Sequence, residues 1–131
     1  MKQIIMDLDG TLTIDSDTDY KNKAINKAIL KQIRYYKKLG FRIIIFTSRN
    51  MRTYNGDLSK ISKNTLPIII EWLEKYKVPY DDIIVGKPWC GFDGFYVDDK
   101  AIRPSEFIRY SYDEILGILK EENPYNDGGN K

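Results

Sequence analysis

The sequence predicts an α/β protein in which helices flank a parallel sheet in a three-layer, Rossmann-like arrangement. Short apolar runs that read as strands alternate along the chain with segments of helical periodicity. Strands joined by helices pair in parallel through right-handed crossovers. Each apolar run is also followed at once by polar residues, as expected where ligands bind beyond the carboxyl ends of parallel strands.

The first part of the chain predicts a strand and a helix. Residues 2–6 are apolar enough for a short buried strand, which stops at the first acid. After a polar stretch, Asp17 or Asp19 is expected to cap a long helix that runs to about Leu39, where Gly40 supplies a left-handed stop. Apolar residues recur every three or four positions, so one helix face should pack on the sheet. They are Ala24, Ile25, Ala28, Ile29, Ile33, Tyr36 and Leu39.

The middle of the chain predicts a strand, a loop and a helix. Residues 41–50, FRIIIFTSRN, are largely apolar, which is typical of a central parallel strand covered on both faces. Residues 51–63 are polar without clear periodicity and are expected to form a mobile loop that acts as a partial lid. Asn64 is expected to cap the next helix, with Pro67 in its first turn. The expected buried side of that helix consists of Ile69, Ile70, Leu73 and Tyr76.

The last part of the chain predicts two strands and a helix. Residues 82–86 and 94–97 are short apolar runs that read as strands. Ser111 and Glu114 form a capping box ahead of a helix over residues 112–122.

Size and composition indicate one globular domain over residues 1–122, followed by a disordered tail at 123–131. The fractions of 42% hydrophobic and 31% charged residues are ordinary for a globular chain, and no apolar run is long enough to span a bilayer. The N-terminus turns acidic too soon for a signal peptide. We therefore expect a cytoplasmic protein in which Cys90, the single cysteine, forms no internal disulfide.

Charge and residue usage narrow the chemistry. The formal charge of +2 is small and the lysines are spread along the helical segments, so neither a nucleic-acid nor a membrane partner is expected, while a homo-oligomer stays open. The chain has no histidine, which removes the commonest general base and the commonest metal ligand. Chemistry here must depend on carboxylates, hydroxyls and lysine.

Reactive side chains follow every predicted strand. Because the carboxyl ends of parallel strands share one edge of the sheet, these side chains are expected to gather there. In chain order they are Asp7 and Asp9, then Thr47 and Ser48, then Lys87, then Asp98 and Asp99. Arg49 comes just after the second strand and is either a contact to substrate or a solvated loop residue.

Taken in order, DLDGT, the end of IIIFTS, GKP and YVDD resemble the four motifs of the haloacid dehalogenase superfamily of aspartate-based phosphohydrolases, over residues 2 to about 122. DxDGT is the specific part, since four fixed residues recur by chance on the order of 10⁻⁵ per window. The dehalogenases of the superfamily lack an acid two residues after the nucleophile, and its ion-pumping ATPases carry lysine directly after it. Leu8 and Asp9 therefore favour a phosphatase. The short intervals between the motifs imply a capless type.

The resemblance also implies roles. Asp7 would attack phosphorus and form an aspartyl-phosphate, and Asp9 would protonate the leaving oxygen and later activate water. Thr47, with Ser48 as its competitor, would hydrogen-bond a phosphoryl oxygen, and Lys87 would neutralise the developing charge.

The resemblance implies one Mg²⁺ as cofactor. Its ligands would be the Asp7 carboxylate, the backbone carbonyl of Asp9 and Asp98, with Asp99 joining through water. Substrate contacts are expected from Thr47, Ser48, Arg49 and Lys87.

The run YVDDKAIRPSEF is similar to short phosphatase-like proteins associated with capsular polysaccharide biosynthesis. A phosphorylated sugar, amino alcohol or sugar conjugate is therefore the expected substrate. Two other classes stay open: a receiver-like signalling domain that carries a phospho-aspartate, and a non-catalytic binding module. Against a receiver, Lys87 precedes Asp98 and Asp99, whereas a receiver's acidic pair comes first and its lysine last.

Overall fold

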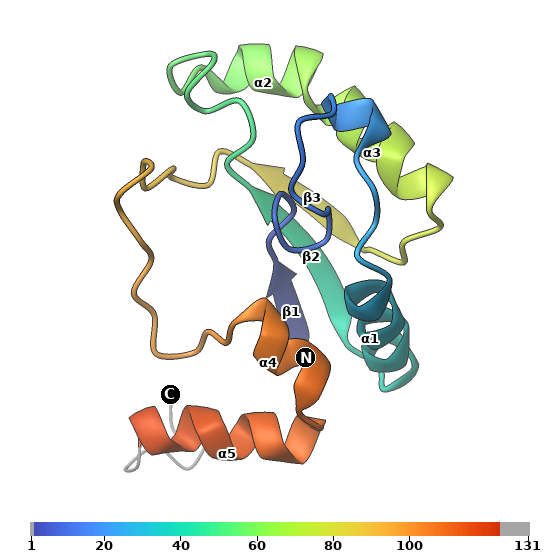
Figure 1. Cartoon of the computed structure of the whole chain (residues 1–131), viewed down its shortest axis with the longest axis vertical. Helices are drawn as coiled ribbons and strands as arrows, with labels where there is room; N and C mark the ends of the chain where they lie inside the picture. The colour runs from blue at the N-terminus through green and yellow to red at the C-terminus, as the bar shows by residue number, and fades with distance from the viewer. Residues whose placement is uncertain (1, 124–131) are drawn as a thin grey trace. The chain divides into compact units, whose positions relative to one another are not determined.

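The computed structural model describes residues 2–123 (Figure 1). The chain divides into two compact units, Met1–Trp89 and Cys90–Lys131, and each is described by itself. The expectation of a single domain over residues 1–122 stays a prediction. Of the predicted disordered tail at 123–131, all but the first residue lies outside the described residues.

The first unit is built on a parallel sheet in the order β1-β2-β3, so β2 lies in the middle (Figure 1). The strands are β1 (Gln3–Met6), β2 (Arg42–Thr47) and β3 (Asp82–Val85). Met6 lies opposite Ile45, and Thr47 lies opposite Val85. The three strands therefore end close together at one edge. The predicted α/β class with a parallel sheet and flanking helices is confirmed.

Helices of the first unit follow β1 and β2. They are the short 3-10 helix η1 (Tyr20–Asn22), α1 (Lys27–Lys38), α2 (Leu58–Asn64) and α3 (Leu66–Lys75). The helix α1 packs on β2, and its buried residues are Ile29, Leu30, Ile33 and Tyr36. All of these but Leu30 belong to the predicted face, whereas Ala28 and Leu39 of that face are exposed. Among residues 2–123, no helix has both the length and the apolar character needed to cross a membrane.

The first predicted helix begins later than expected. Asp19 caps only η1, and the cap of α1 is Asn26, whose side chain accepts from the Ile29 N–H. Between them the chain is extended, because Ile25 forms a bridge to Thr13. The Lys23 carbonyl also accepts a hydrogen bond of 2.8 Å from the Trp72 indole N–H. These long-range contacts hold residues 23–25 out of the helix, and periodicity cannot reveal them.

The predicted loop over residues 51–63 is only partly a loop. It opens with turns, but Asp57 caps α2 by accepting from the Lys60 N–H, so its second half is helical. Thr65, and not Asn64, occupies the N-cap position of the next helix, although its side chain makes no capping hydrogen bond, and Pro67 lies in the first turn as predicted. Its buried residues are Ile69, Trp72 and Leu73.

The second unit contains two helices, α4 (Pro104–Arg109) and α5 (Tyr112–Glu122). The capping box of Ser111 and Glu114 is confirmed, whereas α4 was not predicted. The strand expected over 94–97 is absent from the described residues. An apolar run becomes a strand only when a neighbour supplies the hydrogen bonds of a ladder, and Val97 is 88% exposed. Phe92 of the same unit is exposed as well.

Asp81 joins the start of β3 to β2. Its backbone N–H donates to the Ile43 carbonyl at 2.8 Å, and its carboxylate accepts from the Ile43 N–H at 2.7 Å. Lys37 approaches the same carboxylate to 2.8 Å. These hydrogen bonds, first from Lys37 and then from Ile43, lower the pKa of Asp81. The folded state therefore favours the ionised carboxylate.

We expect Asp81→Asn to destabilise the protein at pH 7 by roughly 0.5–1 kcal/mol, because the ion pair is largely solvated. A carboxylate with a depressed folded-state pKa stabilises above its unfolded pKa of about 3.9, and this contribution is lost as pH falls through the folded value. The loss should thus shrink as pH falls below about 4 in urea titrations. Asp82→Asn, at an exposed carboxylate that accepts from the adjacent Ile83 N–H, is the control. A loss of unfolding free energy in Asp81→Asn that does not depend on pH would contradict this account.

Candidate active site

A tight turn follows β1 and places the first carboxylate. The Leu8 carbonyl accepts from the N–H groups of Leu12 at 2.9 Å and Thr13 at 3.0 Å, and Gly10 takes a left-handed φ of 79°. The turn brings Thr11 back onto Asp7, where the Thr11 hydroxyl donates to Oδ2 at 2.9 Å. This contact fixes the Asp7 carboxylate, whose side chain remains 37% exposed. Asp7 is therefore held in place yet open to a ligand.

Lys87 comes to Asp7 from the end of β3. Its ammonium lies 3.6 Å from Asp7 Oδ1, while Thr11 occupies the other carboxylate oxygen. The Lys87 backbone N–H donates to the Thr47 carbonyl at 3.1 Å, which continues the pairing of β3 with β2 beyond the strand. Gly86 makes the turn possible with a φ of 89°. The sheet thus brings the first and third motifs together.

Thr47 ends β2 beside these groups. Its hydroxyl oxygen accepts from the Arg49 backbone N–H at 3.1 Å. Within residues 2–123 no group is seen to accept the Thr47 hydroxyl proton, so this proton is available to a ligand oxygen. Ser48, its competitor for the same role, is half-buried, and its backbone carbonyl accepts from the Met51 N–H.

Asp9 has a different partner from Asp7. Arg49 donates to both of its oxygens, from Nε at 2.9 Å and from Nη2 at 2.7 Å. The Arg49 side chain is 1% exposed, so the alternative of a solvated loop residue is wrong. The Tyr20 ring covers the guanidinium, with its centroid 4.1 Å from Cζ. Asp9 is therefore held by a bidentate ion pair with a buried arginine.

Tyr20 is the aromatic neighbour of this ion pair. Partial burial first, and the Asp9 carboxylate second, raise the pKa of the Tyr20 hydroxyl, while the Arg49 charge acts in the opposite direction. The hydroxyl therefore stays protonated at physiological pH, and Tyr20 contributes a ring and a neutral donor to the site.

The two remaining acids belong to the second unit. Asp98 Oδ1 accepts from the Lys100 N–H at 2.8 Å, and Asp99 accepts from the Asn123 side chain at 2.7 Å. Their roles at the site stay predictions.

Magnesium fits the donors of the first unit in chemical type. The partly exposed Asp7 side chain offers carboxylate oxygens, which are hard ligands of the kind that Mg²⁺ prefers. The resemblance implies the backbone carbonyl as the Asp9 ligand, so the hydrogen bonds from Arg49 to the Asp9 carboxylate do not compete with it. Taken unit by unit, the described residues hold no ready-made group of three or more Asp, Glu or Cys side chains. Any complete metal shell therefore needs further ligands.

Two residues at the site were not singled out from the sequence. Thr11 was seen only as part of the DxDGT pattern, although a hydroxyl four residues after the nucleophile is what a returning turn can bring back. Tyr20 lies in a polar stretch without a pattern. Only the folded chain shows that it covers Arg49.

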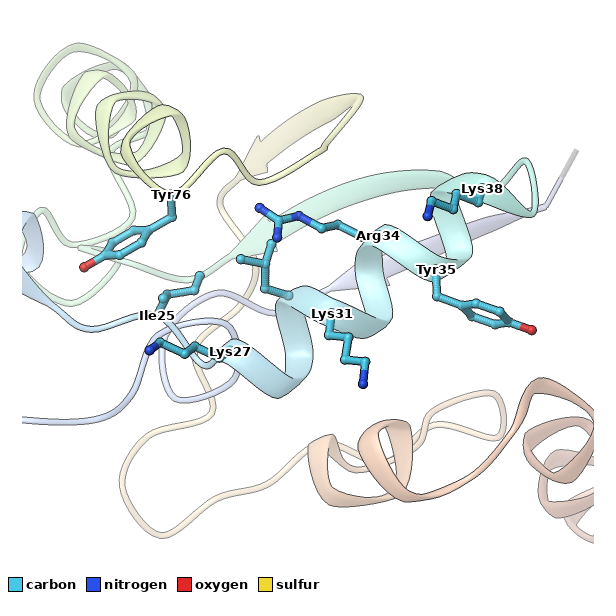
Figure 2. A pocket seen from close by; sticks show the side chains of 8 residues that line it. Ile25, Lys27, Lys31, Arg34, Tyr35, Lys38 and Tyr76 are labelled. Carbon is cyan, nitrogen blue, oxygen red and sulfur yellow. The ribbon is translucent and has the colours of Figure 1, made fainter.

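A separate groove of 690 Å³ runs along the exposed face of α1 (Figure 2). Its lining consists of Ile25, Lys27, Leu30, Lys31, Arg34, Tyr35, Lys38 and Tyr76. None of the strand-end residues contributes to it, so it is not part of the candidate active site.

Comparison with known proteins agrees with this geometry. Residues 4–65 match the family of haloacid dehalogenase-like hydrolases. The crystal structure of an MCSG target from Vibrio cholerae is 55% identical and covers 93% of this chain and 99% of its own, with a TM-score of 0.92. The chain belongs to the haloacid dehalogenase-like hydrolases.

This haloacid dehalogenase-like hydrolase also has a more distant likeness. A chain in the structure of a Pnkp1/Rnl/Hen1 complex is 21% identical and has a TM-score of 0.51, with 82% of this chain and 34% of that chain covered. At this identity the likeness concerns the fold alone. The comparison with curated proteins found no match.

The turn before Lys87 favours glycine, because its φ is positive. A Cβ on Gly86 would lie 2.7 Å from Leu58 Cδ2, at a φ of 89°. We expect Gly86→Ala to lower the free energy of unfolding by about 1–3 kcal/mol and to reduce the hydrolase activity, because Lys87 shifts. Gly117→Ala, with nothing within 4 Å, is the matched control and should be neutral or slightly stabilising. Equal stability of the two variants in urea titrations would refute this constraint.

Proposed function

We propose that this hydrolase is a magnesium-dependent phosphomonoesterase that works through an aspartyl-phosphate on Asp7. The observation that supports it most is the Asp7 carboxylate, held by Thr11 at 2.9 Å, facing Lys87 at 3.6 Å and 37% exposed. A fixed, accessible carboxylate beside a cation can approach a phosphate dianion, which an isolated carboxylate would repel.

The reaction has two steps. In the first, an Asp7 oxygen bonds to phosphorus while the bond from phosphorus to the leaving oxygen breaks, and Asp9 gives that oxygen a proton. In the second, water attacks phosphorus, Asp9 removes its proton, and the bond between Asp7 and phosphorus breaks to release inorganic phosphate. Thr47 donates its free hydroxyl proton to a phosphoryl oxygen, and Lys87 offsets negative charge.

Asp7 and the Asp9 carbonyl are the proposed metal ligands in the first unit, and Asp98, with Asp99 through water, is the proposed contribution of the second. When bound, magnesium supplies positive charge that offsets the charge of the phosphate.

The proposed substrate is a phosphorylated sugar, amino alcohol or sugar conjugate of capsular or surface polysaccharide biosynthesis. Its support is the similarity of YVDDKAIRPSEF to phosphatase-like proteins of that process. Arg49 was expected to contact substrate, but in the folded chain its fork is directed at Asp9. A panel of phosphorylated sugars and amino alcohols, ranked by kcat/KM, tests the substrate class.

A receiver-like domain and a non-catalytic binding module are the competing functions. A receiver would hold its phosphate without rapid turnover, and a binding module would not react at all. Release of phosphate from a generic aryl phosphate in the presence of magnesium distinguishes the phosphatase from both.

Asp7→Asn should abolish both turnover and phosphoenzyme, because an amide oxygen is too weak a nucleophile. Asp9→Asn should still form phosphoenzyme but lose activity by ~10²- to 10⁴-fold, the usual contribution of one acid-base group. Acid-quenched labelling with a ³²P-labelled substrate, followed by peptide mapping, measures both. A label that persists at a strand-end aspartate in Asp7→Asn would show that the nucleophile is another residue.

Chelation with EDTA should abolish phosphatase activity, and excess Mg²⁺ should restore it, because the charge on the attacking carboxylate and on the phosphate must be neutralised. A thermal shift with Mg²⁺ should appear in the wild type and shrink in Asp7→Asn. Full activity in excess chelator would rule out the metal requirement.

A further inference from the structure

The ion pair between Arg49 and Asp9 has a feature that stability does not explain. Two nitrogens of Arg49 bind the carboxylate, but the third, Nη1, is buried without a hydrogen-bond partner among the described residues. A buried unsatisfied donor on a charged group is costly, and such groups are rare in native proteins. The arrangement therefore has an energetic cost, which a surface arginine would avoid.

The bidentate contact fixes the orientation of the Asp9 carboxylate. A carboxylate has roughly four lone-pair positions, and a bidentate guanidinium occupies two, one on each oxygen. Both oxygens keep a position for a proton, while the plane of the carboxylate is fixed. The pair is asymmetric, since the Asp9 side chain is 34% exposed and that of Arg49 is 1% exposed. Asp9 thus remains open to a ligand while Arg49 lies behind it.

Two further contacts hold Arg49 itself. Its backbone N–H donates to the Thr47 hydroxyl oxygen at 3.1 Å, so the residue is fixed at the end of β2. The Tyr20 ring lies over its guanidinium, with the centroid 4.1 Å from Cζ, a distance suited to a cation–π contact. Arg49 is therefore restrained at its backbone and at its head.

We propose that Arg49 is a positioning residue that orients Asp9 for proton transfer, with Tyr20 as the cover that keeps Arg49 in place. This inference rests on the proposed function and deepens it. It is proposed in place of the expectation that Arg49 contacts the substrate. The effect should be largest in the second step, where Asp9 takes a proton from water as the Asp7–phosphorus bond breaks. Asp9 enters this step as an ionised carboxylate, which is the form that a guanidinium holds most firmly in one orientation.

The second step also separates the two roles of Arg49. By then the leaving group has gone, so a residue that contacts only the non-phosphate part of the substrate cannot change the rate of phosphoenzyme breakdown. A positioning residue must change it. The readout is therefore breakdown of isolated ³²P-phosphoenzyme, together with the burst of 4-nitrophenolate from 4-nitrophenyl phosphate, a leaving group that needs little protonation.

We expect Arg49→Met to slow phosphoenzyme breakdown by roughly 10²-fold, within the range for loss of an acid-base group, and to produce a burst that the wild type lacks. The ratio kcat/KM for 4-nitrophenyl phosphate should stay within about threefold, because substrate binding and the first step lose no direct contact, whereas KM should fall together with kcat as the phosphoenzyme accumulates. Arg49→Lys keeps the charge but cannot form two parallel hydrogen bonds, so it should recover only part of the rate. Arg34→Met, at an exposed arginine of α1, is the matched control and should behave as the wild type.

A double-mutant cycle with Asp9→Asn is decisive. If Arg49 acts through Asp9, Arg49→Met should cause no further loss in the Asp9→Asn background. Multiplicative losses, or an effect on KM alone, would overturn the inference while leaving the phosphatase intact. A wild-type protein that forms no phosphoenzyme would overturn the proposed function and this inference with it.

Tyr20 provides a test if Arg49→Met does not fold. Because the Tyr20 ring is partly exposed, Tyr20→Ala should fold, and it should slow breakdown by less than Arg49→Met does. Tyr20→Phe keeps the ring over the guanidinium and should stay close to the wild type. Equal rates of phosphoenzyme breakdown in the wild type, Tyr20→Ala and Tyr20→Phe, with Arg49→Lys also at the wild-type rate, would contradict the positioning role.

Discussion

The parallel pairing of β1, β2 and β3 is the constraint on which the candidate site depends. Parallel strands end at the same edge, so residues that follow Met6, Phe46 and Val85 are neighbours in space. The pairing continues past the strands, since the Lys87 N–H still donates to the Thr47 carbonyl. Backbone hydrogen bonds alone thus bring Asp7, Thr47 and Lys87 to the same edge of the sheet.

Within this frame, two carboxylates two residues apart acquire different environments. Asp7 is bound by a hydroxyl and faces a lysine at 3.6 Å, which leaves an oxygen available for attack. Asp9 is bound at both oxygens by a buried arginine. The chain turns directly after Asp9, at Gly10 with its left-handed φ, and the Asp7 and Asp9 carboxylates have different partners. A nucleophile and an acid-base group require this kind of difference, because one must bond to phosphorus while the other exchanges only a proton.

Several elements were misjudged from the sequence for physical reasons that differ. Asp19 is a good cap, but it caps η1, because Ile25 bridges to Thr13 and interrupts the helical pattern. Residues 58–64 lack an obvious apolar stripe, yet Asp57 begins a helix there whose Ile61 is buried. Residues 94–97 have the composition of a strand, and composition cannot supply a neighbouring ladder. The first and third errors concern a partner that is distant in sequence, whereas the second missed a local cap, since Asp57 accepts from the Lys60 N–H.

By itself, the sequence determined the alternation of strands and helices in the first unit, the capping box of α5, and the positions of Asp7, Thr47 and Lys87 at the ends of three strands, because these depend on local periodicity and spacing. The tertiary structure alone decided how the charges are matched. Arg49 is 40 positions from Asp9, and nothing local indicates that it is buried against that carboxylate rather than solvated. The same holds for Thr11 on Asp7 and Tyr20 over Arg49, since a turn and a packed ring bring these groups together only when the chain is folded.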